Sequence, residues 1–513
     1  MNFKLNRETI PANELIYSGI QEQGVELDYI LPDYYPDIFR LVRCELIPVA
    51  TDHAIIGNKL SYELCCDIRL IYCSEDGSSL QCITQRQNFS KTLELSKAPD
   101  NPEITLSPKS DHVNFRAVNK RRLDVRGAVS VKITVTGEKF QEIVNDAFGL
   151  NVQLKKAPLR FTAKKVTADK TIQLSEDTEL SAAQPSVLGI IRSQVDVGEC
   201  EKKIISGKLL AKGDVNLKLL YSSDSGIELL ELSIPFSQII DMEDIDESFE
   251  CSVSADVISC NITPVPDKNG ENRLLRIEPE LKLICRGVKT SEIMAAFDAY
   301  STVYPCEPEF SVIRAEQPPT VYAEGFRHTA QIASGDGVPQ KIYAMWCSPK
   351  NINTRIGNDG RSVIISGMLT YSMAAADASG AMIMPDHDEA FEETIEIGDD
   401  IKNSAISAAV TDISVSYNIT DQGILNARSD ISVKISVDGS MGIRTLTGLT
   451  IDDSTKKQRD GDYAIKLYFS SENEEIWDIA KRFSTEVSAI IEENDLDSEQ
   501  LNGSSMLLIP IKE

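Results

Sequence analysis

The strongest constraint on the fold is an internal repeat, which emerges when the sequence is compared with itself at an offset of 149 residues. Segment 36–43 then falls on segment 185–192, and the register holds without a gap for about forty residues. Within it the offset pairs Lys59-Leu60 with Lys208-Leu209, Tyr72 with Tyr221, and Gly77 with Gly226. A chain with such copies is expected to fold as tandem modules of one kind.

A looser third copy follows the first two. With small gaps, the first two copies also pair 131–133 with 281–283 and 146–148 with 298–300. In the third copy, the Ile-Ile-Ser-Gly sequence at 364–367 repeats that at 204–207, and the Ser-Val-Lys-Ile sequence at 432–435 repeats that at 130–133. The shared order of these matches argues against coincidence.

Each copy has mainly a two-residue hydrophobic period, which is typical of half-buried strands. In the first copy the apolar positions are Leu60, Tyr62, Leu64, Cys66, Ile68, Leu70 and Tyr72, and segment 209–221 keeps the pattern in the second. Turn-forming residues follow at 75–77 and 224–226, so that each long strand is expected to open a hairpin. The sequence therefore predicts a mainly β protein of antiparallel modules.

The period breaks at 142–147 and at 291–300, where we expect one helix to close each of the first two copies. The predicted layout has an N-terminal segment (1–23) and three β-rich repeat domains (24–160, 161–315 and a divergent 316–450). A polar linker (451–462) and a small C-terminal domain (463–513) follow. Ala374, Ala375 and Ala376 stand where the other copies carry larger residues, which leaves open whether the third copy is a full domain.

The three copies resemble the SPOCS domain of spore-forming Firmicutes. The resemblance rests on the Leu-Pro-Asp-Tyr-Tyr-Pro-Asp-Ile sequence at 31–38, the Ile-Ile-Ser-Gly strand start, the Ser-Val-Lys-Ile strand and the Asp-Ala-Phe or Asp-Ala-Tyr ending. It covers roughly residues 24 to 450. Pro36 and Pro185 are also explained by a fixed turn before a buried segment, which is an architectural role.

Segment 463–513 has a different pattern: a short strand, an amphipathic helix with Ile476, Ile479, Ala480 and Phe483 on one face, a second helix with Val487, Ile490 and Ile491, and a closing strand at 506–511. This order resembles the βααβ fold of the LysM domain. The Ile-Trp-x-Ile-Ala sequence that begins at Ile476 and the later Asn494 supply the family's features.

The resemblance assigns candidate binding residues to this LysM-like domain: Asn473, Glu474, Glu475, Ile476, Trp477 and Asn494. Where sugar-binding members of the family have Gly-Asp-Thr, this chain has Asn473-Glu474-Glu475. Residues 460–513 hold 13 acidic and 4 basic side chains, a net charge of −9. A protein partner with a basic surface is therefore favoured over glycan. Trp477 can stack on a sugar, but on such a helix it is more often a core or interface anchor.

SPOCS repeats followed by a LysM module resemble the SipL-type spore morphogenetic family. The resemblance implies a sporulation adaptor in the mother-cell cytoplasm, which helps to assemble the spore coat at the forespore surface. Its LysM domain would dock on the coat-basement ATPase, stage IV sporulation protein A, and its repeats would contact other coat proteins or associate with each other. The alternative is a cell-wall or cortex protein that binds peptidoglycan, a polymer containing N-acetylglucosamine.

Composition and motifs argue against several other classes of protein, namely nucleic-acid-binding, disulfide-rich, secreted and membrane-inserted proteins. The formal net charge is −27, from 79 acidic and 52 basic residues, and such a surface repels nucleic acid and anionic lipid. Eleven scattered cysteines argue against a disulfide framework and favour a reducing cytosol. The N-terminus lacks the apolar region of a signal peptide, and no run of about 18 apolar residues predicts membrane insertion.

Nothing in the sequence predicts catalysis. The four histidines lie apart, outside any spacing typical of a zinc site, and there is no nucleophile elbow or Walker A loop. The Gly-Asp-Gly sequence at 335–337 lacks the flanking strand and helix of a dinucleotide site and is read as a loop. We therefore expect a non-enzymatic protein without a metal or cofactor.

Overall fold

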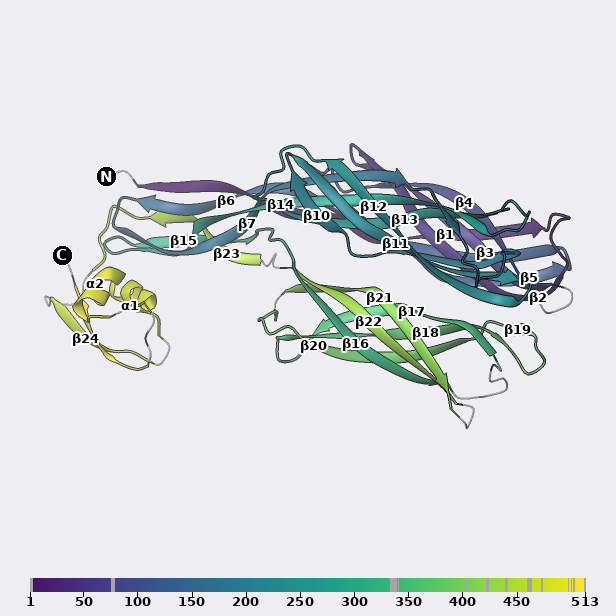
Figure 1. Ribbon diagram of the computed structural model, residues 1–513. Coiled ribbons are helices and arrows are strands. Elements are labelled where there is room, and N and C mark those ends of the chain that lie inside the picture. Colours follow the sequence, from purple (N-terminus) through teal and green to yellow (C-terminus); the bar gives the residue numbers. More distant parts are fainter. Residues whose placement is uncertain are drawn as a thin grey trace.

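A computed structural model describes residues 3–74, 79–332, 339, 341–402, 404–420, 424–438, 442–458, 464–471, 474–496, 498–499, 501 and 503–511. Most of these residues lie in antiparallel strands, as the two-residue period predicts, and only two short helices occur among them. Figure 1 shows two β modules side by side, a third beside them, and a small C-terminal module near the N-terminal end of the chain. Of the predicted turns, 75–77 lies outside the described residues, as does the loop at 335–337.

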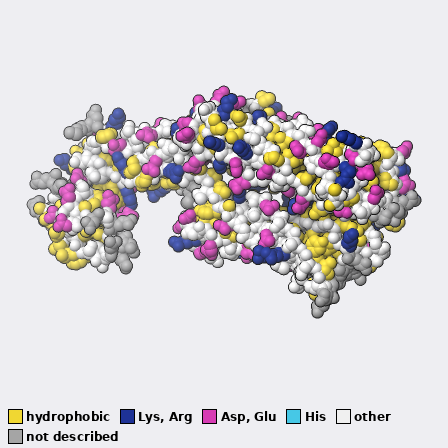
Figure 2. Space-filling view, in the orientation of Figure 1, with side chains coloured by type: hydrophobic (Ala, Val, Ile, Leu, Met, Phe, Trp, Pro, Cys, Tyr) yellow, Lys and Arg dark blue, Asp and Glu magenta, His cyan; other side chains and the backbone are white. Residues whose placement is uncertain are grey.

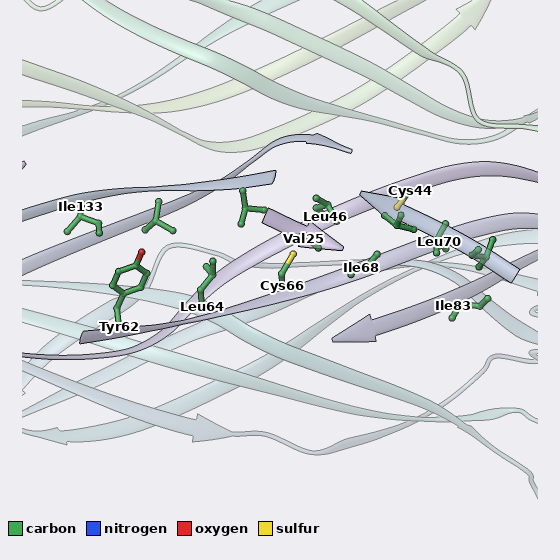
Figure 3. Close-up of a cluster of buried hydrophobic side chains, with 14 of the residues drawn as sticks. Val25, Cys44, Leu46, Tyr62, Leu64, Cys66, Ile68, Leu70, Ile83 and Ile133 are labelled. Carbon is green, nitrogen blue, oxygen red and sulfur yellow. The ribbon is translucent and has the colours of Figure 1, made fainter. Parts of the chain in front are cut away.

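The first module is a sandwich of two three-stranded sheets. One sheet has the order β1 (Lys4–Ile30), β6 (Arg122–Phe148), β5 (Glu103–Asn119), and the other β2 (Ile38–Ile56), β3 (Lys59–Ser74), β4 (Leu80–Glu94). Alternate side chains of both sheets meet in one core, part of which Figure 3 shows. Cys66 is fully buried there, and burial raises the pKa of its thiol to about 11, so that it packs as a small protonated hydrophobe.

The second module has the same pairing order. One sheet contains β7 (Val152–Gln173), β14 (Leu274–Ser301) and β13 (Glu250–Val265), with β8 (Glu176–Glu179) added to β14. The other contains β9 (Gly189–Val197), β10 (Glu201–Ile205), β11 (Lys208–Ser223) and β12 (Gly226–Asp241). The offset of 149 residues also relates a contact: the Tyr72 hydroxyl donates to the Pro36 carbonyl at 3.0 Å, and that of Tyr221 to the Pro185 carbonyl at 3.3 Å.

The third module repeats this arrangement with a break in its long strands. The outer pair is split into β15 (Cys306–Arg314) and β16 (Thr320–Ile332) on one side and β22 (Leu425–Asp438) and β23 (Gly442–Ile451) on the other; β21 (Ala405–Ile419) pairs with β22. The second sheet comprises β17 (Lys341–Ile356), β18 (Ser362–Ala376), β19 (Met382–Ile383) and β20 (Asp386–Glu396). Ala374 and Ala376 are buried against residues of the first two modules, so their small size permits close packing between modules.

The long strands continue past their modules into a shared stalk. We use this name for three antiparallel pairs: 4–14 with 137–148, 152–162 with 290–301, and β15 with β23. Their side chains form two cores, in which Ile143 packs near Ala295 and Val144 packs with Ala296 and Leu446. The predicted boundaries at 23/24 and 160/161 therefore fall inside β1 and β7, which each serve a module and the stalk.

The two helices predicted at 142–147 and 291–300 are wrong, because both segments are strands of the stalk. Each segment contains a bulge, in which one residue of the later strand of the pair has no partner opposite. These residues are Asn145 in β6 and Phe297 in β14. A third bulge lies in the pair of β15 and β23, where Thr447 of β23 has no partner opposite. Because a bulge inserts one residue, it interrupts the two-residue period and imitates the start of a helix.

The C-terminal module follows the stalk. It consists of β24 (Ile465–Phe469), α1 (Ile476–Phe483), α2 (Val487–Glu493) and β25 (Met506–Pro510), with β24 and β25 antiparallel. Ile476, Ile479 and Ile490 are fully buried in its core, as the helical periodicity predicts. The assignment of this module to the LysM family stays a prediction.

Candidate partner-binding site

The C-terminal module contacts the stalk through Trp477 of α1. Its indole Nε1 donates a hydrogen bond of 2.9 Å to the Asp298 carboxylate of β14, and its ring meets that of Tyr300 edge-on, with centroids 4.9 Å apart. Only 5% of Trp477 is exposed. Of the two roles that the sequence allows for this side chain, its position fits the anchor.

Asp298 is the polar centre of this contact. Besides the indole, it accepts hydrogen bonds from the Lys481 ammonium at 2.7 and 2.8 Å. Burial by itself would raise the pKa of Asp298, but the bonds from Lys481 and Trp477 outweigh it, so that the pKa lies below its usual value. The carboxylate is therefore charged at neutral pH.

Glu474 and Glu475, adjacent in sequence, act in different places. The Glu475 carboxylate forms an ion pair with Lys155 of β7 and so adds a second link to the stalk. The Glu474 carboxylate turns into its own module, where it accepts hydrogen bonds from the Tyr468 hydroxyl at 2.8 and 3.0 Å and pairs with Arg482 at 3.1 Å.

Two further predicted residues hold the module together. Ile476 is fully buried in the core. The Asn494 amide donates to the Ile490 carbonyl at 2.8 Å and the Leu508 carbonyl at 2.7 Å, and its oxygen accepts from the Leu508 amide at 2.7 Å. Asn494 thus ties α2 to β25. Asn473 lies outside the described residues.

The structure therefore brings Glu475 and Trp477 together on one face and uses Glu474, Ile476 and Asn494 inside the module. The partners of that face, Lys155, Asp298 and Tyr300, are distant in sequence and were not predicted. The Asp-Ala-Tyr sequence at 298–300 was a usable signal, since it recurs as Asp-Ala-Phe at 146–148. The broken two-residue period in the same segments predicts a helix end instead and so gives no hint of a contact with the C-terminal module.

The outer face of the β24–β25 sheet is exposed and apolar. Alternate residues of β24 point away from the helices: Ile465 is 46% exposed, Leu467 58% and Phe469 74%. Met506, opposite Phe469 in the ladder, is 58% exposed. Hydrophobic side chains gather in Figure 2 at the edge of the molecule where Figure 1 places β24. We call these four residues the outer apolar face.

A cleft of about 510 Å³ lies beside Trp477, between the module and the stalk. Aromatic rings of Phe297, Phe310 and Trp477 line it together with charged groups. The guanidinium of Arg444, which also lines it, lies 3.9 Å from the centre of the Phe310 ring. The cleft shows that the contact around Asp298 is not packed on all sides.

A second charged cluster joins the first two modules. Glu45 of β2 pairs with Arg43 at 2.8 Å, Arg69 at 3.4 Å and Arg192 of β9 at 3.5 Å. Burial would raise the pKa of Glu45, but the three guanidinium groups outweigh it and hold the pKa below its usual value. Arg43 also pairs with Asp386 of β20 at 2.6 Å, so the cluster links all three β modules, which is a structural role.

Three further features concern the described part of the chain. These residues contain no group of three or more His, Cys, Asp or Glu side chains placed to hold a metal ion. The eleven cysteines, all of them described, form no disulfide. No helix among the described residues is long and apolar enough to cross a membrane.

Comparison with known proteins gives one match. Residues 186–265, which run from just before β9 to the end of β13 in the second module, match the family model described as SipL, SPOCS domain. No curated protein and no solved structure matches the chain. The match falls on the copy in which Pro185 and Tyr221 repeat the contact of Pro36 and Tyr72. This segment is therefore similar to the SPOCS domain of the SipL family.

Proposed function

We propose that this chain is a non-enzymatic sporulation adaptor, which helps to localise and assemble the spore coat around the forespore from the mother-cell cytoplasm. The C-terminal module docks on the coat-basement ATPase of the stage IV sporulation protein A type, and the β modules offer surfaces to other coat proteins. The SPOCS match at 186–265 supports the sporulation role.

The outer apolar face is the observation that carries the docking role. Contiguous exposed apolar side chains are unfavourable in water and commonly mark a protein interface. Ile465, Leu467, Phe469 and Met506 stay uncovered while α1 is held against the stalk, so the module has one face for its own chain and another for a partner. This division of faces supports an adaptor.

Charge indicates the kind of partner surface. Residues 460–513 carry a net charge of −9, so the outer apolar face lies on a strongly acidic module. A complementary partner has an apolar patch bordered by Lys and Arg, and the rim charges accelerate association in a salt-dependent way.

Peptidoglycan is the second candidate. The cleft beside Trp477 supports it, because aromatic rings can stack on sugars. Against it, Glu474 and Glu475, which replace an acid and a small hydroxyl of the sugar-binding pattern, are engaged by Arg482 and Lys155. Trp477 itself is covered by Tyr300. The protein partner is therefore the better supported function.

Two capture experiments with the full-length chain separate the candidates. Immobilised ATPase should retain the chain, less as salt is raised, and insoluble peptidoglycan should not. In sporulating cells, deletion of 463–513 should leave the coat mislocalised. Retention on peptidoglycan alone, or a normal coat after the deletion, would contradict the proposal.

A further inference from the structure

We propose that the face of the C-terminal module formed by Trp477, Lys481 and Thr485 is a binding site for a β-strand end that carries an aspartate and, two residues later, an aromatic residue. Asp298-Ala299-Tyr300 of β14 occupies this site in the chain itself. This face is not the outer apolar face. The proposal therefore does not depend on which partner binds the outer apolar face.

The aspartate has a built site. The Asp298 side chain is only 19% exposed, and it accepts hydrogen bonds from the Trp477 indole, the Lys481 ammonium and the backbone amide of Ala299, the last at 2.8 Å. Bonds that involve an ionised partner are stronger than neutral ones. An uncharged residue at position 298 would lose this advantage.

The aromatic residue is part of the module's own core. Tyr300 is 2% exposed and belongs to the same cluster as Ile476, Ile479 and Ile490. Its hydroxyl donates to the Thr485 carbonyl at 2.7 Å. A residue from β14 therefore completes the core of a segment that lies almost two hundred residues further along the chain, and without it the module has an open aromatic slot.

The spacing of the two residues follows from strand geometry. Residues i and i+2 point to the same side of a strand, so Asp298 and Tyr300 both reach the module while Ala299 turns into the stalk core, where it is fully buried. The bulge at Phe297 sets this orientation at the end of β14. Recognition thus requires an aspartate, a small residue and an aromatic in this order.

The first module offers a second strand end of this kind. Asp146 accepts a hydrogen bond from the Ala147 amide at 3.0 Å, as Asp298 does from Ala299, and it follows the equivalent bulge. Phe148, in the position of Tyr300, is 56% exposed. It has the ring but not the hydroxyl, and a peptide with this sequence should bind the site more weakly than the 298–300 sequence.

Peptide binding tests the proposal directly. The Asp298→Ala/Tyr300→Ala chain has a vacant site, and it should bind a labelled peptide of residues 295–301, measured by fluorescence anisotropy. The wild-type chain should bind it at least about tenfold more weakly, because its own strand competes. Replacing the peptide's Asp by Asn should weaken binding about tenfold. A peptide of residues 144–150 should compete for the same site. Equal binding by both chains, or by a scrambled peptide, would overturn the proposal.

A second measurement applies even if the double variant does not fold. A zero-length carbodiimide crosslinker should join Lys155 to Glu475 in the wild-type chain, since these side chains form an ion pair across the contact. Asp298→Asn should lower the yield of this crosslink several-fold. Asp146→Asn is the matched control, because it changes the equivalent aspartate away from the module, and it should leave the yield unchanged. Equal yields in the two variants would refute the role of Asp298.

Discussion

The Asp298 carboxylate and the Trp477 indole, 179 residues apart in sequence, are joined by a hydrogen bond of 2.9 Å. With Lys481 on the same carboxylate, this bond links the stalk to the C-terminal module. The sequence suggests repeats followed by an independent domain. In the structure, however, the C-terminal module packs against β14 of the second module.

The contact should open in acid. Because the pKa of Asp298 is lowered in the folded chain, its stabilisation is complete above the ordinary aspartate pKa of about 3.9 and is lost as the pH falls through the lower folded value. In a Trp346→Phe background, where Trp477 is the only tryptophan, its fluorescence should change over this acid range. Asp298→Asn should lack this transition. The same transition in both chains would show that a group other than Asp298 controls it.

Glu45 should be important for stability. Glu45→Gln leaves Arg43, Arg69 and Arg192 close together and largely buried without their common carboxylate, and we expect a loss of about 3 kcal/mol. Thermal unfolding measures this loss as a lower midpoint. Glu22→Gln, on an exposed position of β1, is the control and should be neutral. A midpoint equal to that of the control would contradict the structural role of the cluster.

Tyr72 and Tyr221 should be equivalent. Each is buried and donates to the carbonyl of the proline 36 residues earlier, so Tyr→Phe at either position should cost about 1 kcal/mol. Tyr34→Phe, which is 79% exposed, should have no effect. Chemical denaturation of the three variants tests this, and a cost at only one of the two buried positions would argue against a shared role in the copies.

Gly127 should tolerate no side chain. A Cβ atom there would lie 2.5 Å from the His112 carbonyl oxygen of the neighbouring strand, which cannot move freely. We expect Gly127→Ala to destabilise by about 1 to 3 kcal/mol. Gly24→Ala is a close control, since nothing lies within 4 Å of its added Cβ and it sits on the paired strand β1. Equal unfolding midpoints for the two variants would contradict the close approach of Gly127 to the His112 carbonyl.

Local patterns predicted the elements well where the period was regular. The alternation from Leu60 to Tyr72 became β3, and the apolar face with Ile476 and Ile479 became α1. The period failed at Asn145 and Phe297, because a bulge depends on how two strands are paired, and in the sequence its break in the period looks the same as the start of a helix.

The candidate site was predicted only in part. Trp477 and Glu475 were identified from their own segment, but their partners depend on how β14 and β7 end in the stalk, which is a tertiary property. The outer apolar face was open to prediction from the alternation of Ile465, Leu467 and Phe469. It was missed because alternating apolar residues also describe a buried strand, and only the packing of the helices decides which side is covered.

The most direct test of the central claim is the affinity of the full-length chain for the ATPase when the outer apolar face carries a charge. Phe469→Glu changes a residue that is 74% exposed, so it should leave the fold intact, and Ile20→Glu, 68% exposed on β1, is the matched control. Phe469→Glu should raise the Kd by more than about tenfold, and Ile20→Glu should leave it unchanged. Unchanged affinity in Phe469→Glu would show that the outer apolar face is not the docking surface.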